Sequence, residues 1–163
     1  MKNVRYIVVP LVLLCLSLSA LAFEDKDTTF IDSYIANQAR RERGEEYREG
    51  RQVATGDLNH HGTSDIAVLY TIEGQHDTNL HIQYLVVFVR TGDKLVAAAR
   101  AEVGGKGTRS LELKAIEDNA IHLETLEYGP TDPSCCPSER DKTNYVLAGN
   151  ELKEQKKGPP RQK

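Results

Sequence analysis

Apolar residues follow two different spacings along this chain, one typical of a helix and one typical of strands. Between residues 28 and 42 they recur three and four positions apart, which predicts an amphipathic helix. From residue 53 to about residue 157 they alternate with polar residues in short runs separated by turn residues, which predicts strands. The apolar face of the predicted helix comprises Phe30, Ile31, Tyr34, Ile35 and Ala39. We expect Asp27 or Thr28 to cap the start of this helix.

The alternating runs predict a mainly β fold, an antiparallel meander of about seven strands with the one N-terminal helix against a face or edge. The run HIQYLVVFVR, residues 81–90, is apolar on both faces and is therefore expected to be a central strand. Turn residues at 91–94, 117–119 and 149–150 predict three hairpins. Strands and helices do not alternate along the chain, which argues against a parallel sheet.

The N-terminus has the features of a secretory signal peptide. Lys2 and Arg5 precede an apolar run that ends in Ala20-Leu21-Ala22, and this order is typical of a signal cleaved after residue 22. The sequence thus predicts a signal peptide at 1–22, a single globular domain at 23–157 and a disordered tail at 158–163. No later segment is apolar for long enough to span a membrane, so we expect no membrane span after signal cleavage.

The charge balance limits the class of partner. The formal net charge is −3, and loss of Lys2 and Arg5 with the signal peptide makes the protein more acidic. An acidic protein has no net field that would hold nucleic acid. We therefore expect a periplasmic or secreted protein whose partner is another protein or a cell-wall component of the envelope.

The segment GDLNHHGTSD, residues 56–65, has oxygen-bearing side chains at the spacing of a calcium loop. Such side chains at alternate positions can surround one hard cation, because the chain curls around it. The candidate ligands are Asp57, Asn59, His61 and Asp65. An EF-hand is excluded, because the position that needs an acid holds Val68. The alternative is a loop organised by Asx turns from Asp57 and Asn59, with Gly62 in a left-handed conformation.

The longer segment VATGDLNHHGTSDIAVLY, residues 53–70, resembles the FG-GAP or VCBS-type repeat of integrin-like β-propellers. The resemblance implies a strand, a calcium loop and a second strand, with Asp57, Asn59, His61 and Asp65 at the ligand positions. It occurs once, and the chain has room for only about two four-stranded blades, so it implies this local unit and not a propeller. His61 departs from the family's Asp or Asn, and imidazole is a poor calcium ligand. The expected cofactor is therefore none, or Ca²⁺.

A second candidate segment is YGPTDPSCCPSERDK, residues 128–142. Its D-P-x-C-C-P-S part resembles a segment of small bacterial envelope proteins of unassigned function, and this resemblance implies no activity. Once the signal is removed, Cys135 and Cys136 are the only cysteines. Three interpretations remain open: a vicinal disulfide that fixes the loop, separate thiols or an intermolecular link, and a redox switch or soft-metal thiolate site.

The segment VGGKGTRS, residues 103–110, departs from the phosphate-loop spacing, because Gly107 follows Lys106. It predicts a turn between strands, with Lys106 and Arg109 as possible anion contacts. Taken together, these patterns favour an exported binding module without catalytic activity, of an envelope-protein-binding or inhibitor type. Its expected contacts are the loops 57–65, 104–109 and 130–137. The alternatives are a thiol-dependent protein acting through Cys135 and Cys136, and a calcium-stabilised β domain.

Overall fold

The computed structural model describes residues 15–133 and 136–155, and the chain divides into two compact units, residues 1–34 and 35–163. Helix α1 runs from Cys15 to Arg41 and belongs to both units. Most of the predicted signal peptide and the predicted tail at 158–163 lie outside the described residues. Within the described part of the chain, no helix is both long enough and apolar enough to cross a membrane.

The end of α1 agrees with the predicted helix, but its beginning does not. The helix starts at Cys15, so Asp27 and Thr28 lie inside it and cap no helix start, contrary to the prediction. In the second unit, Ile35 and Ala39 are buried, as the spacing of four residues predicts for an inner face. Phe30, which the pattern placed on the same face, is exposed.

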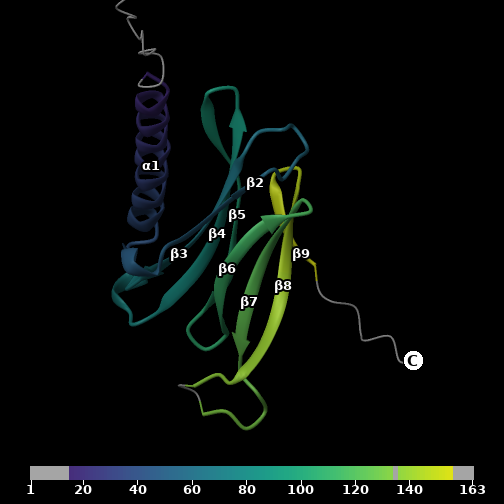
Figure 1. The fold of residues 1–163 in the computed structure, drawn as a ribbon. Coiled ribbons are helices and arrows are strands. Elements are labelled where there is room, and N and C mark those ends of the chain that lie inside the picture. The colour runs from purple at the N-terminus through teal and green to yellow at the C-terminus, as the bar shows by residue number, and fades with distance from the viewer. Residues whose placement is uncertain (1–14, 134–135, 156–163) are drawn as a thin grey trace, which may run out of the picture. The chain divides into compact units, whose positions relative to one another are not determined.

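In the described part of the chain, nine strands and two short 3-10 helices follow α1, and these strands form two antiparallel sheets (Figure 1). The first sheet has the order β1-β3-β4-β5, and β2 also pairs with β3. Its strands are β1 (Glu45–Glu46), β2 (Gln52–Gly56), β3 (Asp65–Glu73), β4 (His81–Thr91) and β5 (Lys94–Gly105). The 3-10 helices η1 (Arg48–Gly50) and η2 (Gln75–Asp77) lie in its connections.

The second sheet contains the last four strands in the order of the chain. They are β6 (Arg109–Glu117), β7 (Ala120–Glu127), β8 (Glu139–Ala148) and β9 (Glu151–Gln155). The predicted mainly β, antiparallel fold with an N-terminal helix is thus confirmed. The meander has two more strands than the approximate seven expected, and it is divided between two sheets. The predicted central strand is β4, which lies between β3 and β5.

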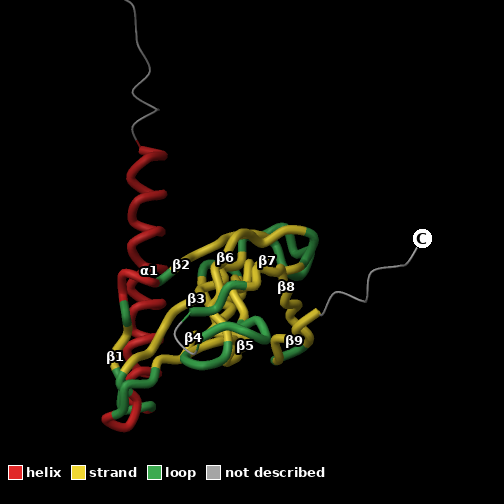
Figure 2. The backbone as a smooth tube through the Cα atoms, turned by 90° about the horizontal axis from the view of Figure 1, so that it is seen from below, coloured by secondary structure: helices red, strands yellow, loops and turns green. Residues whose placement is uncertain are grey.

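The main hydrophobic core lies between the two sheets, whose strands Figure 2 shows from a second direction. Strands β3 and β4 are apolar on both faces, so one face of each can pack on the second sheet while the other face is also buried. In strands β6 and β7, buried residues alternate with more exposed ones, and the buried side chains complete the core. The buried members are Leu58, Ala67, Leu69, Leu85, Val87, Val103, Leu111, Leu113, Ile116, Ile121, Leu123 and Tyr145.

Two glutamines of the first sheet bind the backbone of β6, which is an edge strand of the second sheet. The Gln83 side chain accepts a hydrogen bond from the Leu111 N–H (2.8 Å) and donates one to the Leu111 carbonyl (3.2 Å). The Gln52 side chain accepts a hydrogen bond from the Leu113 N–H (2.7 Å). These amides give the edge of β6 the partners that a further strand would otherwise supply.

On its other face, the first sheet carries a polar cluster among buried apolar residues. The Arg100 guanidinium lies 3.7 Å from the centre of the Tyr84 ring and donates from Nε to the Tyr70 hydroxyl (2.8 Å). The Glu42 carboxylate accepts hydrogen bonds from both Tyr84 and Arg100. Burial, reinforced by the bond to Glu42, raises the pKa of Tyr84. This cluster joins the residue that follows α1 to three strands of the sheet.

Candidate functional site

The loops of the second unit gather at two opposite ends of the strands. The β3–β4 connection, the β5–β6 turn and the described part of the β7–β8 loop lie at one end, which we call the loop end (residues 74–80, 106–108, 128–133 and 136–138). The loop 57–64 and the β4–β5, β6–β7 and β8–β9 turns lie at the other (Figure 1). The structure therefore brings together two of the three predicted contact loops, 104–109 and 130–137, and separates them from 57–65.

The β5–β6 turn is fastened to the start of β4. The Lys106 N–H donates to the His81 carbonyl (2.9 Å), and Lys106 Nζ donates to the Asn79 carbonyl (3.2 Å). Gly105 has φ 151°, and a Cβ at this position would lie 2.5 Å from the His81 oxygen. Only glycine fits this close approach without a shift of the backbone. The turn is thus held in place by the contacts of Gly105 and Lys106 with residues 79 and 81.

Arg109 is an internal clamp between the sheets and not a free cation. Its Nε donates to the Val103 carbonyl (2.8 Å), and Nη1 and Nη2 bind the two carboxylate oxygens of Glu154 (2.7 and 3.0 Å). Nη2 also donates to the Tyr145 hydroxyl (3.0 Å), and Glu127 lies 3.5 Å from Nη1. All the guanidinium nitrogens therefore have partners within the protein. Of the two predicted contact cations, Lys106 is the one with donors left for a ligand.

The clamp also changes the titration of its partners. The hydrogen bonds from Arg109 hold the pKa of Glu154 below its ordinary value. Burial raises the pKa of Tyr145 to about 12. The bonds to Glu154, in turn, raise the pKa of Arg109. At neutral pH the clamp is thus an ion pair with a neutral tyrosine beside it.

Three hollows adjoin one another at the loop end. The first, of about 640 Å³, is lined by Arg43, Gly44, Glu45, Glu73, Gly74, Asn79, Leu80 and His81. The second, of about 440 Å³, is lined by His81, Gly105, Lys106, Gly107, Arg109, Ser110, Leu126, Tyr128 and Pro137. The third, of about 520 Å³, is lined by Glu102, Val103, Gly104, Gly107, Thr108, Arg109, Glu127 and Tyr128. The first two hollows share His81, and the second and third share Gly107, Arg109 and Tyr128. We call the three neighbouring hollows the trough.

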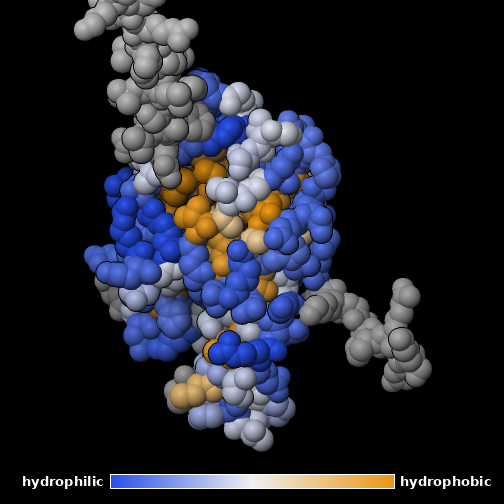
Figure 3. Space-filling model, viewed as in Figure 1, coloured by the Kyte–Doolittle hydropathy of each residue, from blue (hydrophilic) through white to orange (hydrophobic). Residues whose placement is uncertain are grey.

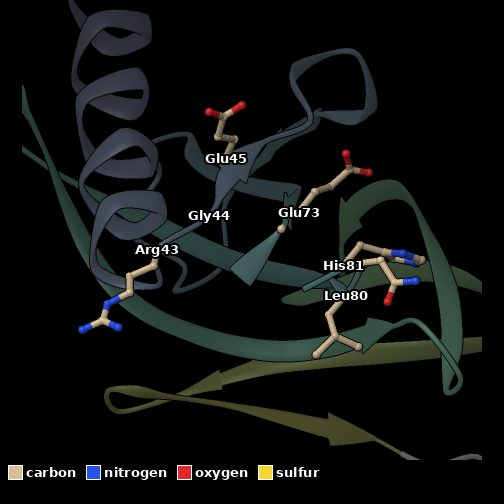
Figure 4. Close-up of a pocket in the computed structure, with 8 residues that line it drawn as sticks. Arg43, Gly44, Glu45, Glu73, Leu80 and His81 are labelled. Carbon is tan, nitrogen blue, oxygen red and sulfur yellow. The ribbon is translucent and has the colours of Figure 1, made fainter. Parts of the chain in front are cut away.

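Charge alternates along the trough. The first hollow carries the carboxylates of Glu45 and Glu73, which extend to one side of it in Figure 4, while the Arg43 guanidinium extends away from them. The middle hollow has Lys106 and no acidic residue in its lining. The third hollow again carries carboxylates, those of Glu102 and Glu127. The lower part of the face in Figure 3, where the β7–β8 loop lies, is mostly hydrophilic, whereas hydrophobic residues gather near the centre of that face.

No family model, curated protein or solved structure matches this chain. The FG-GAP resemblance of residues 53–70 and that of the D-P-x-C-C-P-S segment therefore rest on their own residues. Residues 53–70 form most of β2, the loop 57–64 and the first part of β3, and the resemblance itself stays a prediction.

The loop between β2 and β3 is organised by its own side chains. Asp57 Oδ1 accepts from the N–H groups of Asn59 (3.1 Å) and His61 (3.3 Å), and Asp57 Oδ2 accepts from Gly62 (2.8 Å). Asn59 Oδ1 also accepts from the His61 N–H (3.2 Å). The bond from Gly62 lowers the pKa of Asp57. Gly62 has φ 73°, so the Asx-turn geometry expected for this loop is present.

Asp65 is buried and faces the protein interior. Its Oδ2 accepts from the Leu58 N–H (3.1 Å) and its Oδ1 from the Arg90 N–H (2.9 Å), so it joins the loop to the end of β4. Within the described residues, no three His, Cys, Asp or Glu side chains come together in a way that would hold a metal ion. Calcium binding by Asp57, Asn59, His61 and Asp65 stays a prediction.

The β7–β8 loop is closed by one carboxylate. Asp132 Oδ2 accepts from the N–H groups of Gly129 and Ser138 (2.8 Å each), and Oδ1 accepts from the Ser138 hydroxyl (2.8 Å). The bond from Gly129 lowers the pKa of Asp132. Inside this closed loop, Cys136 is disulfide-bonded. Cys135 lies outside the described residues, so its pairing with Cys136 stays a prediction.

The sequence pattern did not indicate the partners of Arg109 or the role of Gln83. Glu154 lies on β9, 45 residues after Arg109, and one acid among many gives no signal of such a pairing. Gln83 does leave a signal, because it lies on the β4 face that also carries Leu85, Val87 and Val89. A polar residue on a buried face requires a hydrogen-bond partner, which here is β6.

Proposed function

We propose that this protein is an exported binding module that contacts a protein or cell-wall component of the envelope through the trough at its loop end. Three connections from both sheets form this surface, on a scaffold held by the Arg109 clamp and the Gly105 contact. Loops on a rigid sheet framework commonly carry recognition. The single observation that carries the proposal is that three neighbouring hollows, which share lining residues, lie at this end of both sheets. Export is supported by the signal-like N-terminus alone.

The alternating charge of the trough favours recognition of a polar partner. Lys106 provides a cation between two carboxylate-bearing hollows, so a ligand with an acidic group between basic groups complements the surface. Such patterns raise the rate of association and select against partners of the wrong charge order.

Site-specific photo-crosslinking in cells that make the protein tests this proposal. A benzophenone amino acid at Lys106 or Leu80 samples the trough, and the same group at Glu151 samples the opposite end as the matched control. We expect discrete adducts from the first two positions only, and we expect Lys106→Glu to weaken the adduct at Leu80. Equal adducts from Glu151, or none from the trough, would overturn the proposal.

A second candidate is a thiol-dependent role of the β7–β8 loop, which the disulfide at Cys136 favours. Strained or exposed disulfides are easier to reduce than ordinary structural ones. Intact mass after alkylation, with and without a mild reductant, tests this candidate. Opening under mild reductant supports a switch, whereas resistance to it supports a structural role.

A further inference from the structure

Strand β8 is covered by β9 along only part of its length. It runs from Glu139 to Ala148, and β9 pairs with Asn144 to Ala148. Among the described residues, no strand pairs with residues 139–143 on the side away from β7, and residues 139–142 are exposed. We call residues 139–143 the open edge of β8. A strand edge of this kind presents backbone donors and acceptors to which another strand can add.

A hollow of about 350 Å³ adjoins the open edge and is lined by Glu124, Thr125, Arg140, Asp141 and Lys142. The first two residues belong to β7 and the last three to the exposed part of β8, so the surface beside the open edge is hollowed.

The chain's own C-terminal residues are poorly suited to this edge. The β8–β9 register places Gln155 opposite Asn144, so its continuation would place Lys157 opposite Lys142 and Pro159 opposite Arg140. Like charges in opposed positions destabilise a strand pair, and proline has no N–H to donate. A strand from another protein therefore suits the open edge better than the chain's own C-terminal residues do.

The charges of the open edge indicate which sequence such a strand would have. Arg140 and Lys142 are two residues apart and so lie on one face, opposite Leu126 and Glu124 of β7. Glu124 also forms an ion pair with Lys114 (3.1 Å), so its charge is partly balanced already. This face therefore has more positive than negative charge to offer. Acidic side chains at alternate positions of an added strand would complement it.

We propose that the open edge of β8 binds an extended segment of a partner protein by strand addition, with Asp or Glu at alternate positions opposite Arg140 and Lys142. The inference goes beyond the trough and does not depend on it. Lys106→Glu should leave binding at the open edge unchanged, so either site can fail without the other.

Fluorescence anisotropy of labelled eight-residue peptides against the full chain tests the charge pattern. A peptide of alternating Glu and Thr is expected to bind, and one of alternating Lys and Thr is not. Reversal of both Arg140 and Lys142 to Glu should weaken the first peptide about tenfold. Lys153→Glu, at an exposed residue of β9 in the same sheet, is the matched control. An equal loss with Lys153→Glu would show attraction to net charge alone and would overturn the proposal.

Backbone methylation separates strand addition from simple charge attraction. A Glu–Thr peptide N-methylated at alternate residues loses the donors of one edge only, so one methylated series should lose binding and the other should keep it. If both series bind equally, the peptide does not add as a strand. Removal of residues 156–163 should leave the affinity unchanged, and a rise on removal would identify the chain's own tail as the occupant instead.

Discussion

The Gln83 side chain binds both backbone groups of Leu111, as one residue of an adjacent strand would. This contact joins β4 of the first sheet to β6 of the second. We expect Gln83→Met to destabilise the protein by about 1–3 kcal/mol, because it keeps the length of the side chain but leaves the Leu111 groups without partners. Urea unfolding measures the change. The control is Gln155→Met at an exposed position, and equal losses in the two variants would contradict the role of Gln83.

Asp65 is expected to stabilise the β2–β3 loop as an acceptor for two backbone N–H groups. In Asp65→Asn, the amide nitrogen would face one of these donors, and we expect a loss of about 1–3 kcal/mol in the free energy of unfolding. Asp93→Asn, in the exposed β4–β5 turn, is the matched control. If both substitutions have the same small effect on the free energy of unfolding, the buried carboxylate does not stabilise the loop.

Calcium is expected to leave the melting temperature unchanged. Asp57 and Asp65, two of the four candidate ligands, already use both carboxylate oxygens for backbone N–H groups, and Asp65 is buried. A native-state ligand must raise the melting temperature once its concentration exceeds its dissociation constant. Melting in millimolar calcium and in chelator measures the difference. A rise of several degrees in calcium would support the calcium-stabilised alternative.

The Arg109–Glu154 clamp should make stability depend on pH in the acidic range. The pKa of Glu154 in the folded protein is below its ordinary value of 4.5, so the ion pair contributes fully above that pH. The contribution is lost as the pH falls through the lowered value, because the protonated carboxyl no longer pairs with Arg109. We expect Glu154→Gln to cost about 1.5 kcal/mol at pH 7 and less at pH 3. Urea unfolding at both values checks this, and a pH-independent difference would contradict it.

The close approach of Gly105 to His81 predicts a contrast between two neighbouring glycines. A Cβ at Gly105 would collide with the His81 carbonyl, whereas a Cβ at Gly107 would meet nothing within 4 Å, although Gly107 also has a positive φ of 77°. We expect Gly105→Ala to lower the free energy of unfolding by at least about 1 kcal/mol more than Gly107→Ala does. Thermal unfolding of both variants measures this contrast. Similar effects would mean that backbone strain alone explains the requirement for glycine.

The sequence predicted more of the fold than of the candidate site. Hydropathy is a local property, so the continuous apolar run around Leu85 and Val87 was enough to predict a buried central strand. The start of α1 was not predicted, because residues 1–22 had been interpreted as a signal peptide and the predicted helix began at residue 28. The division into two sheets was not predicted either, because periodicity shows which residues are buried but not what they pack against.

The candidate site could not be predicted fully, because its residues are far apart in the sequence and come together only in the folded chain. Lys106 and Pro137 lie 31 positions apart and line the same hollow only because β5–β6 and β7–β8 connect at the same end. Arg109 was predicted as an anion contact because a cation near glycines resembles a binding turn. Its donors are in fact used by Glu154 and Tyr145, which reach it from β9 and β8.

The passage of the chain from the first sheet to the second at the β5–β6 turn bears on the order of assembly. Every strand of the first sheet precedes residue 106 and every strand of the second follows it, so neither sheet waits for a strand from the other. During directional emergence from a ribosome or a translocation channel, the first sheet is complete before the second begins. We therefore expect amides of β3 and β4 to gain protection before those of β7 and β8 in pulsed hydrogen exchange, and simultaneous protection would show that the sheets form only together.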